Sequence, residues 1–279
     1  MITFFICLTL LVAAYFIYGR ALEKVVDIDA SAPVPSKTHY DGVDYMPLPR
    51  WRIFLIQLLN IAGTGPIFGA ILGACYGPVA FVWITLGGIL MGAMHDFVAG
   101  VISLRNEGRS LPETIGKYLG RNMYRLSMVV IPILMVLVGG VFIVTPSKIL
   151  ASMTDMPYLV WVGVVIVYYF IATILPVDKI IGKIYPLFGA ALIFMALAMF
   201  GVVVVGDYEI PELLSLSNEH INAENLPIVP TLFISIACGA ISGFHATQSP
   251  LMARCVTSEK QCRSVFFGAM ISESVIALI

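Results

Sequence analysis

Two apolar stretches of this chain are each interrupted near the middle by residues that disrupt helices. The first, residues 52–74, contains Gly63-Thr64-Gly65-Pro66, and the second, residues 230–255, contains the polar run 242–250, Ser-Gly-Phe-His-Ala-Thr-Gln-Ser-Pro. Unpaired N–H and C=O groups are costly in hydrocarbon, so a broken helix persists there only where its free groups line a site enclosed by protein. Paired interruptions in two halves of a membrane chain are typical of a transporter's substrate and ion site.

The composition indicates a protein that crosses the membrane several times. Hydrophobic residues make up 59% of the 279 residues, charged residues only 12%, and the mean hydropathy is +0.94. The net charge of −1 and the lack of a basic tract argue against nucleic acid as a partner. We find no cofactor motif, and the cysteines lack the paired spacing of a zinc site or a disulfide framework.

A helix needs roughly 20 apolar residues to cross the hydrocarbon. Segments that approach this length are 2–18, 52–74, 79–104, 124–145, 158–175, 184–206, 230–253 and 264–279. The sequence therefore predicts a single transmembrane domain over residues 1–279 with about eight spans. The last segment is still apolar at Ile279, so we expect the chain to stop inside a membrane helix.

The basic residues predict the orientation of these spans, because cytoplasmic loops are enriched in Lys and Arg. All but one of the 16 basic residues fall near alternate loops, within residues 20–52, 105–125, 179–183 and 254–263. Lys148 is the exception. We therefore expect the N-terminus to lie outside, and we interpret residues 2–18 as an anchor, since no basic residue precedes them.

Each interruption has a local cause. Pro66 has no N–H to donate to the carbonyl of Ala62, and Pro250 likewise has none to donate to the carbonyl of Ala246. The alternative is that the glycines and prolines only allow kinks or close helix packing. Our candidate substrate-binding residues are Ala62, Gly63, Thr64, Gly65, Ser242, Gly243, His245, Thr247, Gln248 and Ser249.

Ionisable residues inside apolar segments form a second group of candidates, because such residues are costly in a membrane and usually face a cavity or a partner. Histidine exchanges a proton near neutral pH, which suits a proton relay. The alternative is a hydrogen-bonded group that locks neighbouring helices together. The candidate proton-coupling residues are His245, His95, Asp96 and Glu273.

Several motifs resemble the carbon starvation protein A (CstA) family. They are the stretches 41–45 (Asp-Gly-Val-Asp-Tyr), 61–67, 92–97 (Gly-Ala-Met-His-Asp-Phe), 108–110 (Gly-Arg-Ser), 242–250 and 268–270. The resemblance implies a LeuT-like fold of the amino acid–polyamine–organocation superfamily and proton-driven uptake of peptides or pyruvate across a bacterial inner membrane during carbon starvation. Family members are longer, and many carry a His pair where this chain has Ile56-Gln57.

The expected fold is an all-α bundle with an inverted five-helix repeat, because the second and seventh spans are both broken and run in opposite directions. The expected function is secondary active transport by alternating access, with a peptide or pyruvate substrate, H⁺ or Na⁺ as the coupling ion, and the lipid bilayer as surroundings. One alternative is an intramembrane serine hydrolase that uses Ser242 with His95 or His245. Another is a passive channel, for which we find no filter motif.

Overall fold

The computed structural model describes residues 1–279 except 64, 175–176, 207–209, 238–240 and 242, and it describes only the backbone of 66–67, 174 and 177–186. Within these residues the chain is helical, with connecting turns and loops and no strand. By contacts it divides into two compact units, residues 1–110 together with 184–279, and residues 111–183. Each unit is described separately.

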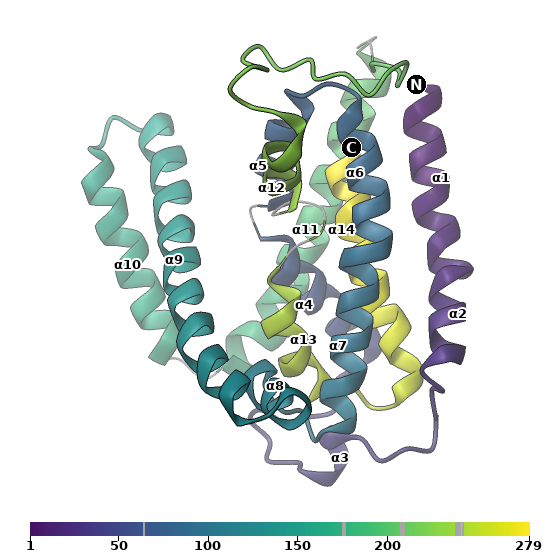
Figure 1. The fold of residues 1–279 in the computed structure, drawn as a ribbon. Helices are drawn as coiled ribbons and strands as arrows, with labels where there is room; N and C mark the ends of the chain where they lie inside the picture. Colours follow the sequence, from purple (N-terminus) through teal and green to yellow (C-terminus); the bar gives the residue numbers. More distant parts are fainter. Residues whose placement is uncertain (64, 175–176, 207–209, 238–240, 242) are drawn as a thin grey trace. The chain divides into compact units, whose positions relative to one another are not determined.

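The first unit begins with α1 (Ile2–Phe16), α2 (Tyr18–Val25), α3 (Pro35–Thr38), α4 (Arg50–Ala62), α5 (Gly65–Ala74), α6 (Val79–Gly87), the π-helical η1 (Gly88–Ala93) and α7 (Met94–Arg105). It resumes within α11 (Val177–Val205) and continues with η2 (Ile228–Leu232), α12 (Phe233–Ile236), α13 (His245–Ala253), η4 (Glu259–Gln261), η5 (Arg263–Phe267) and α14 (Gly268–Leu278). The segments α6, η1 and α7 form one uninterrupted helical rod (Figure 1).

The core of the first unit surrounds α14, which packs against α1, α4, α5, α6 and η1. Its aromatic centre consists of Phe97, Phe266 and Phe267, all without solvent exposure. Gly100 makes this packing possible, because a Cβ atom at this position would lie 2.4 Å from the ring of Phe266. In the same unit α13 packs against α4 and α7.

The second unit contains α8 (Leu111–Leu119), α9 (Arg121–Met153) and α10 (Tyr158–Ile174). Gly120, with a φ of +87°, separates α8 from α9. Helices α9 and α10 lie side by side (Figure 1), and the Tyr169 hydroxyl donates to the Phe142 carbonyl at 3.0 Å. Many of their apolar side chains are exposed, as expected of helices that face lipid.

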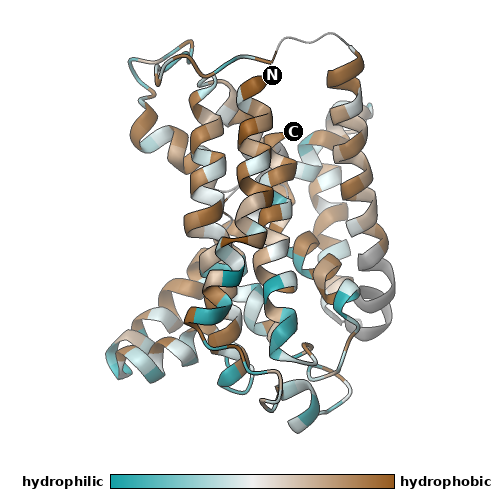
Figure 2. Ribbon diagram, turned by 90° about the vertical axis from the view of Figure 1, so that its right-hand side faces the viewer, coloured by the Kyte–Doolittle hydropathy of each residue, from teal (hydrophilic) through white to brown (hydrophobic). Residues whose placement is uncertain are grey.

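Four helices among the described residues are long and apolar enough to cross a membrane: Ile2–Val25, Val79–Arg105, Arg121–Met153 and Leu187–Val205. They coincide with four of the predicted spans. A fifth apolar helix, Tyr158–Thr173, is shorter. Figure 2 shows hydrophobic residues along the helices and hydrophilic ones gathered toward the end that carries α3.

The first predicted interruption is confirmed. Helix α4 ends at Ala62, and Gly63 has a φ of +50°, a value that glycine adopts without steric cost. Helix α5 then begins at Gly65. Thr64, between them, lies outside the described residues.

The second interruption is shorter than the predicted run from Ser242 to Pro250. Gly243 and Phe244 form a turn, but α13 begins at His245 and continues through Pro250. The prediction that Pro250 helps to break the helix is therefore wrong. The Thr247 hydroxyl donates to the Phe244 carbonyl, and the Ser249 hydroxyl lies within hydrogen-bond distance of the His245 carbonyl and of Asp96, which explains how polar residues are accommodated in this helix.

Candidate functional site

A buried polar cluster lies where α4, α7 and α13 meet. The three helices supply Gln57, Asp96 and Ser249, respectively, and none of these residues has any solvent exposure. The Gln57 amide nitrogen lies 3.1 Å from each Asp96 carboxylate oxygen and 3.4 Å from the Ser249 hydroxyl. The Ser249 hydroxyl also hydrogen-bonds Asp96 and the His245 carbonyl. The cluster thus ties together three helices that are distant in sequence.

A histidine pair adjoins this cluster. His95 precedes Asp96 on α7, and His245 is the first residue of α13. The Nδ1 atom of His95 and the Nε2 atom of His245 are 2.7 Å apart, and the rings meet edge to face with centroids 4.6 Å apart. His245 is buried, whereas His95 is exposed on the first unit. The adjacent residues His95 and Asp96 therefore contact two different residues of α13, His245 and Ser249.

Glu273 is fully buried in α14. Neither of its carboxyl oxygens has a hydrogen-bond partner among the residues that the structure describes. Glu273 is thus the least compensated of the predicted proton-coupling residues.

The substrate-binding candidates are distributed around the two interruptions. Ala62 and Gly65 are buried and Gly63 is half-buried, at the end of α4 and the start of α5. Gly243 is exposed, and Thr247 and Gln248 are half-buried. Thr64 and Ser242 lie outside the described residues. Among these candidates, His245 and Ser249 contact the predicted proton-coupling residues directly.

Gln57 is a site residue that the sequence analysis missed. The signal was present, because an amide side chain within the apolar segment from Ile53 to Ala62 needs a polar partner. The Gln57 amide contacts Asp96 directly, so this position belongs to the candidate site.

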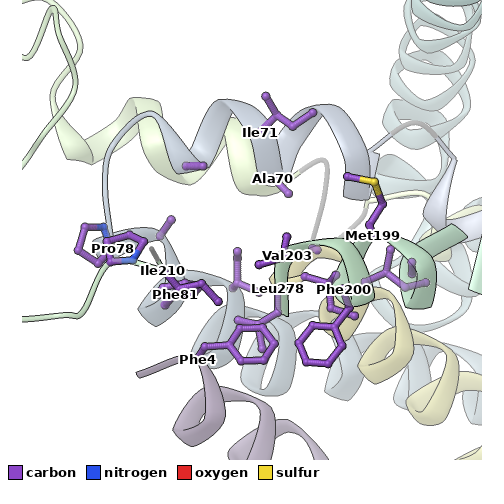
Figure 3. Close-up of a pocket in the computed structure, with 18 of the residues that line it drawn as sticks. Phe4, Ala70, Ile71, Pro78, Phe81, Met199, Phe200, Val203, Ile210 and Leu278 are labelled. Carbon is purple, nitrogen blue, oxygen red and sulfur yellow. The ribbon is translucent and has the colours of Figure 1, made fainter. Parts of the chain in front are cut away.

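An apolar cavity of about 450 Å³ lies elsewhere in the first unit, bordered by residues of α1, α5, α6, α11 and α14 (Figure 3). Phe4, Phe81 and Phe200 are among the residues that line it. None of the predicted substrate-binding or proton-coupling residues that the structure describes lines it. We therefore place the candidate site at the polar cluster, where the ionisable groups are, and not at this cavity.

Two further motifs meet at the end of α13. The Arg254 side chain donates to the Gly108 carbonyl at 2.9 Å, and its guanidinium lies over the Tyr45 ring at 5.2 Å. The Tyr45 hydroxyl donates to the Glu107 carbonyl at 3.1 Å. Gly108 has a φ of +73°, and a Cβ atom there would lie 2.6 Å from the Arg254 side chain. The stretches 41–45 and 108–110 therefore anchor the helix that carries His245 and Ser249.

Comparison with known proteins identifies the family. The family model described as carbon starvation protein CstA matches residues 1–158 and 144–279. A protein from Haemophilus influenzae named "uncharacterized membrane protein" is 41% identical, and the match covers 100% of this chain and 89% of that protein. No solved structure matches.

Two more distant relatives have functional names. The peptide transporter CstA of Campylobacter jejuni is 27% identical over 95% of this chain and 47% of its own length. The pyruvate/proton symporter BtsT of Escherichia coli is 26% identical over 95% of this chain and 46% of its own length. The chain thus spans about half the length of these named transporters. The apolar helices and these matches establish a membrane protein, and the chain belongs to the carbon starvation protein CstA family.

Proposed function

We propose that this protein is a secondary active transporter that takes up peptides or pyruvate by alternating access, driven by protons. The observation that carries the proposal is the buried polar cluster of Gln57, Asp96 and Ser249, joined through α13 to the histidine pair. Polar and ionisable groups among apolar helices are energetically costly, and those that are retained usually have a function. The peptide transporter CstA and the pyruvate/proton symporter BtsT support the choice of substrates and ion.

The substrate site is proposed to lie between the two interruptions. Helices α5 and α13 start there, and the start of a helix carries partial positive charge that attracts a carboxylate. Peptides and pyruvate both have a carboxylate. Carbonyl groups freed at the breaks would hold a cation or an ammonium group. The proposed binding residues are Ala62, Gly63, Thr64, Gly65, Ser242, Gly243, His245, Thr247, Gln248 and Ser249.

Proton coupling is proposed to use His245 first, because it begins the helix after the second break and contacts His95. Asp96 and Glu273 are the buried acids of the same unit. A proton bound among these groups would alter the contacts between α13 and its neighbours α4 and α7. The substrate site and the proton site would thus share one mobile element.

The proposed setting is a bacterial inner membrane with the N-terminus outside and a LeuT-like inverted repeat. The distribution of Lys and Arg along the chain supports the orientation. Labelling of single cysteines at Ile2 and at Lys37 with an impermeant thiol reagent tests it. We expect the Ile2→Cys variant to react in intact spheroplasts and the Lys37→Cys variant to react only after lysis.

Uptake into membrane vesicles from cells that produce the protein tests the function. Pyruvate and short peptides are supplied under an imposed pH gradient, an imposed sodium gradient, or none. Accumulation above equilibrium that a protonophore abolishes is expected. Uptake that only equilibrates the substrate would indicate a channel. Accumulation driven by the sodium gradient would show that Na⁺, not H⁺, is the coupling ion. Cleavage of the substrate would indicate a hydrolase.

A further inference from the structure

Two fully buried carboxyl groups of the first unit have opposite surroundings. Asp96 accepts hydrogen bonds at both oxygens from the Gln57 amide, at 3.1 Å each, and another from the Ser249 hydroxyl. Glu273 has no hydrogen-bond partner at either oxygen among the described residues. The two sites therefore differ in how well they accommodate a negative charge.

The surroundings of Glu273 favour a neutral carboxylic acid. A carboxylate that leaves water and gains no hydrogen bond is strongly unfavourable, so such a group takes up a proton. The titratable residues of the elements that pack against α14 are Cys7, Tyr15, Arg50, Arg52 and Arg263, and no hydrogen bond joins any of them to Glu273.

The hydrogen bonds at Asp96 favour the ionised form of its carboxyl group, against the burial that disfavours a charge there. A primary amide offers two N–H donors, and a hydroxyl offers one. Gln57 and Ser249 direct these donors at the Asp96 carboxylate, and hydrogen bonds to a charged acceptor are stronger than those to a neutral one. The other titratable residues of α7 and of the elements that pack against it are His95, Arg105, His245 and Arg263. His95 and His245 hydrogen-bond each other, Arg105 bonds Glu259, and Arg263 lies 3.3 Å from Glu23. Gln57 is therefore the residue best placed to hold the charge on Asp96.

We propose that Asp96 and Glu273 hold one proton between them in this conformation, with a neutral acid at Glu273, a carboxylate at Asp96, and Gln57 as the positioning residue that fixes this distribution. The inference rests on the proposed proton-driven transport, because it names the group that carries the proton in one state of the cycle. No redox or bond-breaking step is involved. The proton leaves Glu273 for water when the site opens.

Infrared difference spectroscopy of the purified protein tests the proposal without transport. A protonated carboxyl group has a carbonyl stretch that is separate from the bands of carboxylates and amides. At neutral pH, exposed Asp and Glu side chains are ionised and do not contribute to it. The wild-type protein is expected to show one such band, which shifts in heavy water.

The variants assign the band. Glu273→Gln should remove it, and Glu273→Met, whose apolar side chain suits a dry site, should do the same and serves if glutamine is not tolerated. Asp96→Asn should leave it in place. Gln57→Leu removes the amide donors, so a second band should appear as Asp96 takes up a proton, and the added Asp96→Asn change should remove that second band. The matched control is Glu107→Gln, which alters an exposed carboxylate and should change nothing.

Three results would overturn the inference: a band that survives both Glu273 variants, a band that disappears in Asp96→Asn, or no band in the wild-type protein. Uptake measured on the same preparations separates the two proposals. A Glu273 band in a protein without proton-driven uptake would refute the proposed function alone. Proton-driven uptake without a band that depends on Glu273 would refute the one-proton pair alone.

Discussion

The Nε2 atom of His245 lies 2.7 Å from the Nδ1 atom of His95, which links the first residue of α13 to α7. A hydrogen bond between two imidazoles requires one ring N–H and one bare ring nitrogen. If both rings carry two protons, two donors and two positive charges face each other, and the bond is lost. This contact between α13 and α7 therefore depends on the protonation of the pair.

The first prediction concerns His245→Gln. Glutamine retains hydrogen-bonding capacity at about the same reach but cannot carry the proton. We expect pH-driven accumulation to fall to the level of equilibrium exchange, while exchange of substrate across the vesicle membrane continues. Uptake under a pH gradient and counterflow without one measure the two activities separately.

His39→Gln is the matched control, because His39 is exposed and its Nδ1 atom lies 2.9 Å from the hydroxyl of the neighbouring Thr38. This variant should accumulate substrate as the wild type does. If His245→Gln accumulates substrate with an unchanged pH profile, His245 has no part in coupling. The buried acids Asp96 and Glu273 would then be the remaining candidates.

The second prediction concerns Ser249→Ala, which removes a donor to the buried Asp96 carboxylate. A hydrogen bond to a charged group contributes about 1.5–3 kcal/mol, so a loss of about 2 kcal/mol in unfolding free energy is expected, together with weaker proton-driven uptake. Ser272→Ala is the control, since that hydroxyl bonds the carbonyl four residues earlier. Equal thermal stability of the two variants would show that the Asp96 contact contributes little.

Much of the helical framework was predictable from local chemistry. The predicted span 79–104 matches the rod from Val79 to Arg105, because a long apolar run without a breaker has few alternatives to a helix. The break at Gly63 followed from the glycines and from Pro66. The second break was predicted as too long, because Pro250 was expected to interrupt the helix, whereas α13 continues through it.

The contacts of the site were less accessible to sequence reasoning. His95 and His245 are 150 positions apart, and Gln57 and Ser249 are 192 apart, so local periodicity carries no information about their meeting. Sequence reasoning selected ionisable residues because burial makes them costly. It passed over Gln57, a neutral amide, although its hydrogen bonds are what compensate the buried Asp96 charge.

The third prediction concerns Gly100→Ala. The new Cβ atom would lie 2.4 Å from the ring of Phe266, which is fully buried in the core. Overpacking of a core costs about 1–3 kcal/mol, so the melting temperature should fall. Gly139→Ala is the control, because a Cβ at that helical position meets nothing within 4 Å and alanine favours a helix. A Gly100→Ala protein as stable as Gly139→Ala would contradict the close packing of α7 on η5.

The fourth prediction concerns Glu259, whose side chain is only 1% exposed. Its two carboxylate oxygens each accept a hydrogen bond from the Arg105 guanidinium at 2.9 Å, and one of them also accepts the Asp29 backbone N–H at 3.0 Å. Glu259→Ala removes the acceptor of these bonds, while Arg105 keeps its bonds to the Val26 and Asp27 carbonyls, and it should lower the unfolding free energy by about 2 kcal/mol. Glu107→Ala, which removes an exposed carboxylate 3.7 Å from Arg109, should change it by less than about 1 kcal/mol. Similar losses in the two variants would contradict a dominant role for burial.

The last prediction concerns pH and Asp41, in the loop before α4. Its Oδ1 atom accepts the backbone N–H groups of Val43, Asp44 and Tyr45 at 2.8–2.9 Å, and these bonds, led by that from Val43, lower the pKa of Asp41 below its ordinary value. A carboxyl whose pKa is lower in the folded loop than in the unfolded chain stabilises the loop above the ordinary pKa of about 3.9. That stabilisation is lost as the pH falls through the lowered pKa.

Hydrogen exchange at residues 43–45 measures this effect. Asp41→Asn mimics the protonated side chain, so at neutral pH its amides should exchange faster than those of the wild type. The difference should persist to about pH 4 and close as the pH falls further, because the wild-type carboxylate becomes neutral as well. Asp155→Asn, at an exposed position of the other unit, should leave exchange at residues 43–45 unchanged at every pH. A gap between wild type and Asp41→Asn that stays constant down to the lowest pH would show that charge is not what orders this loop.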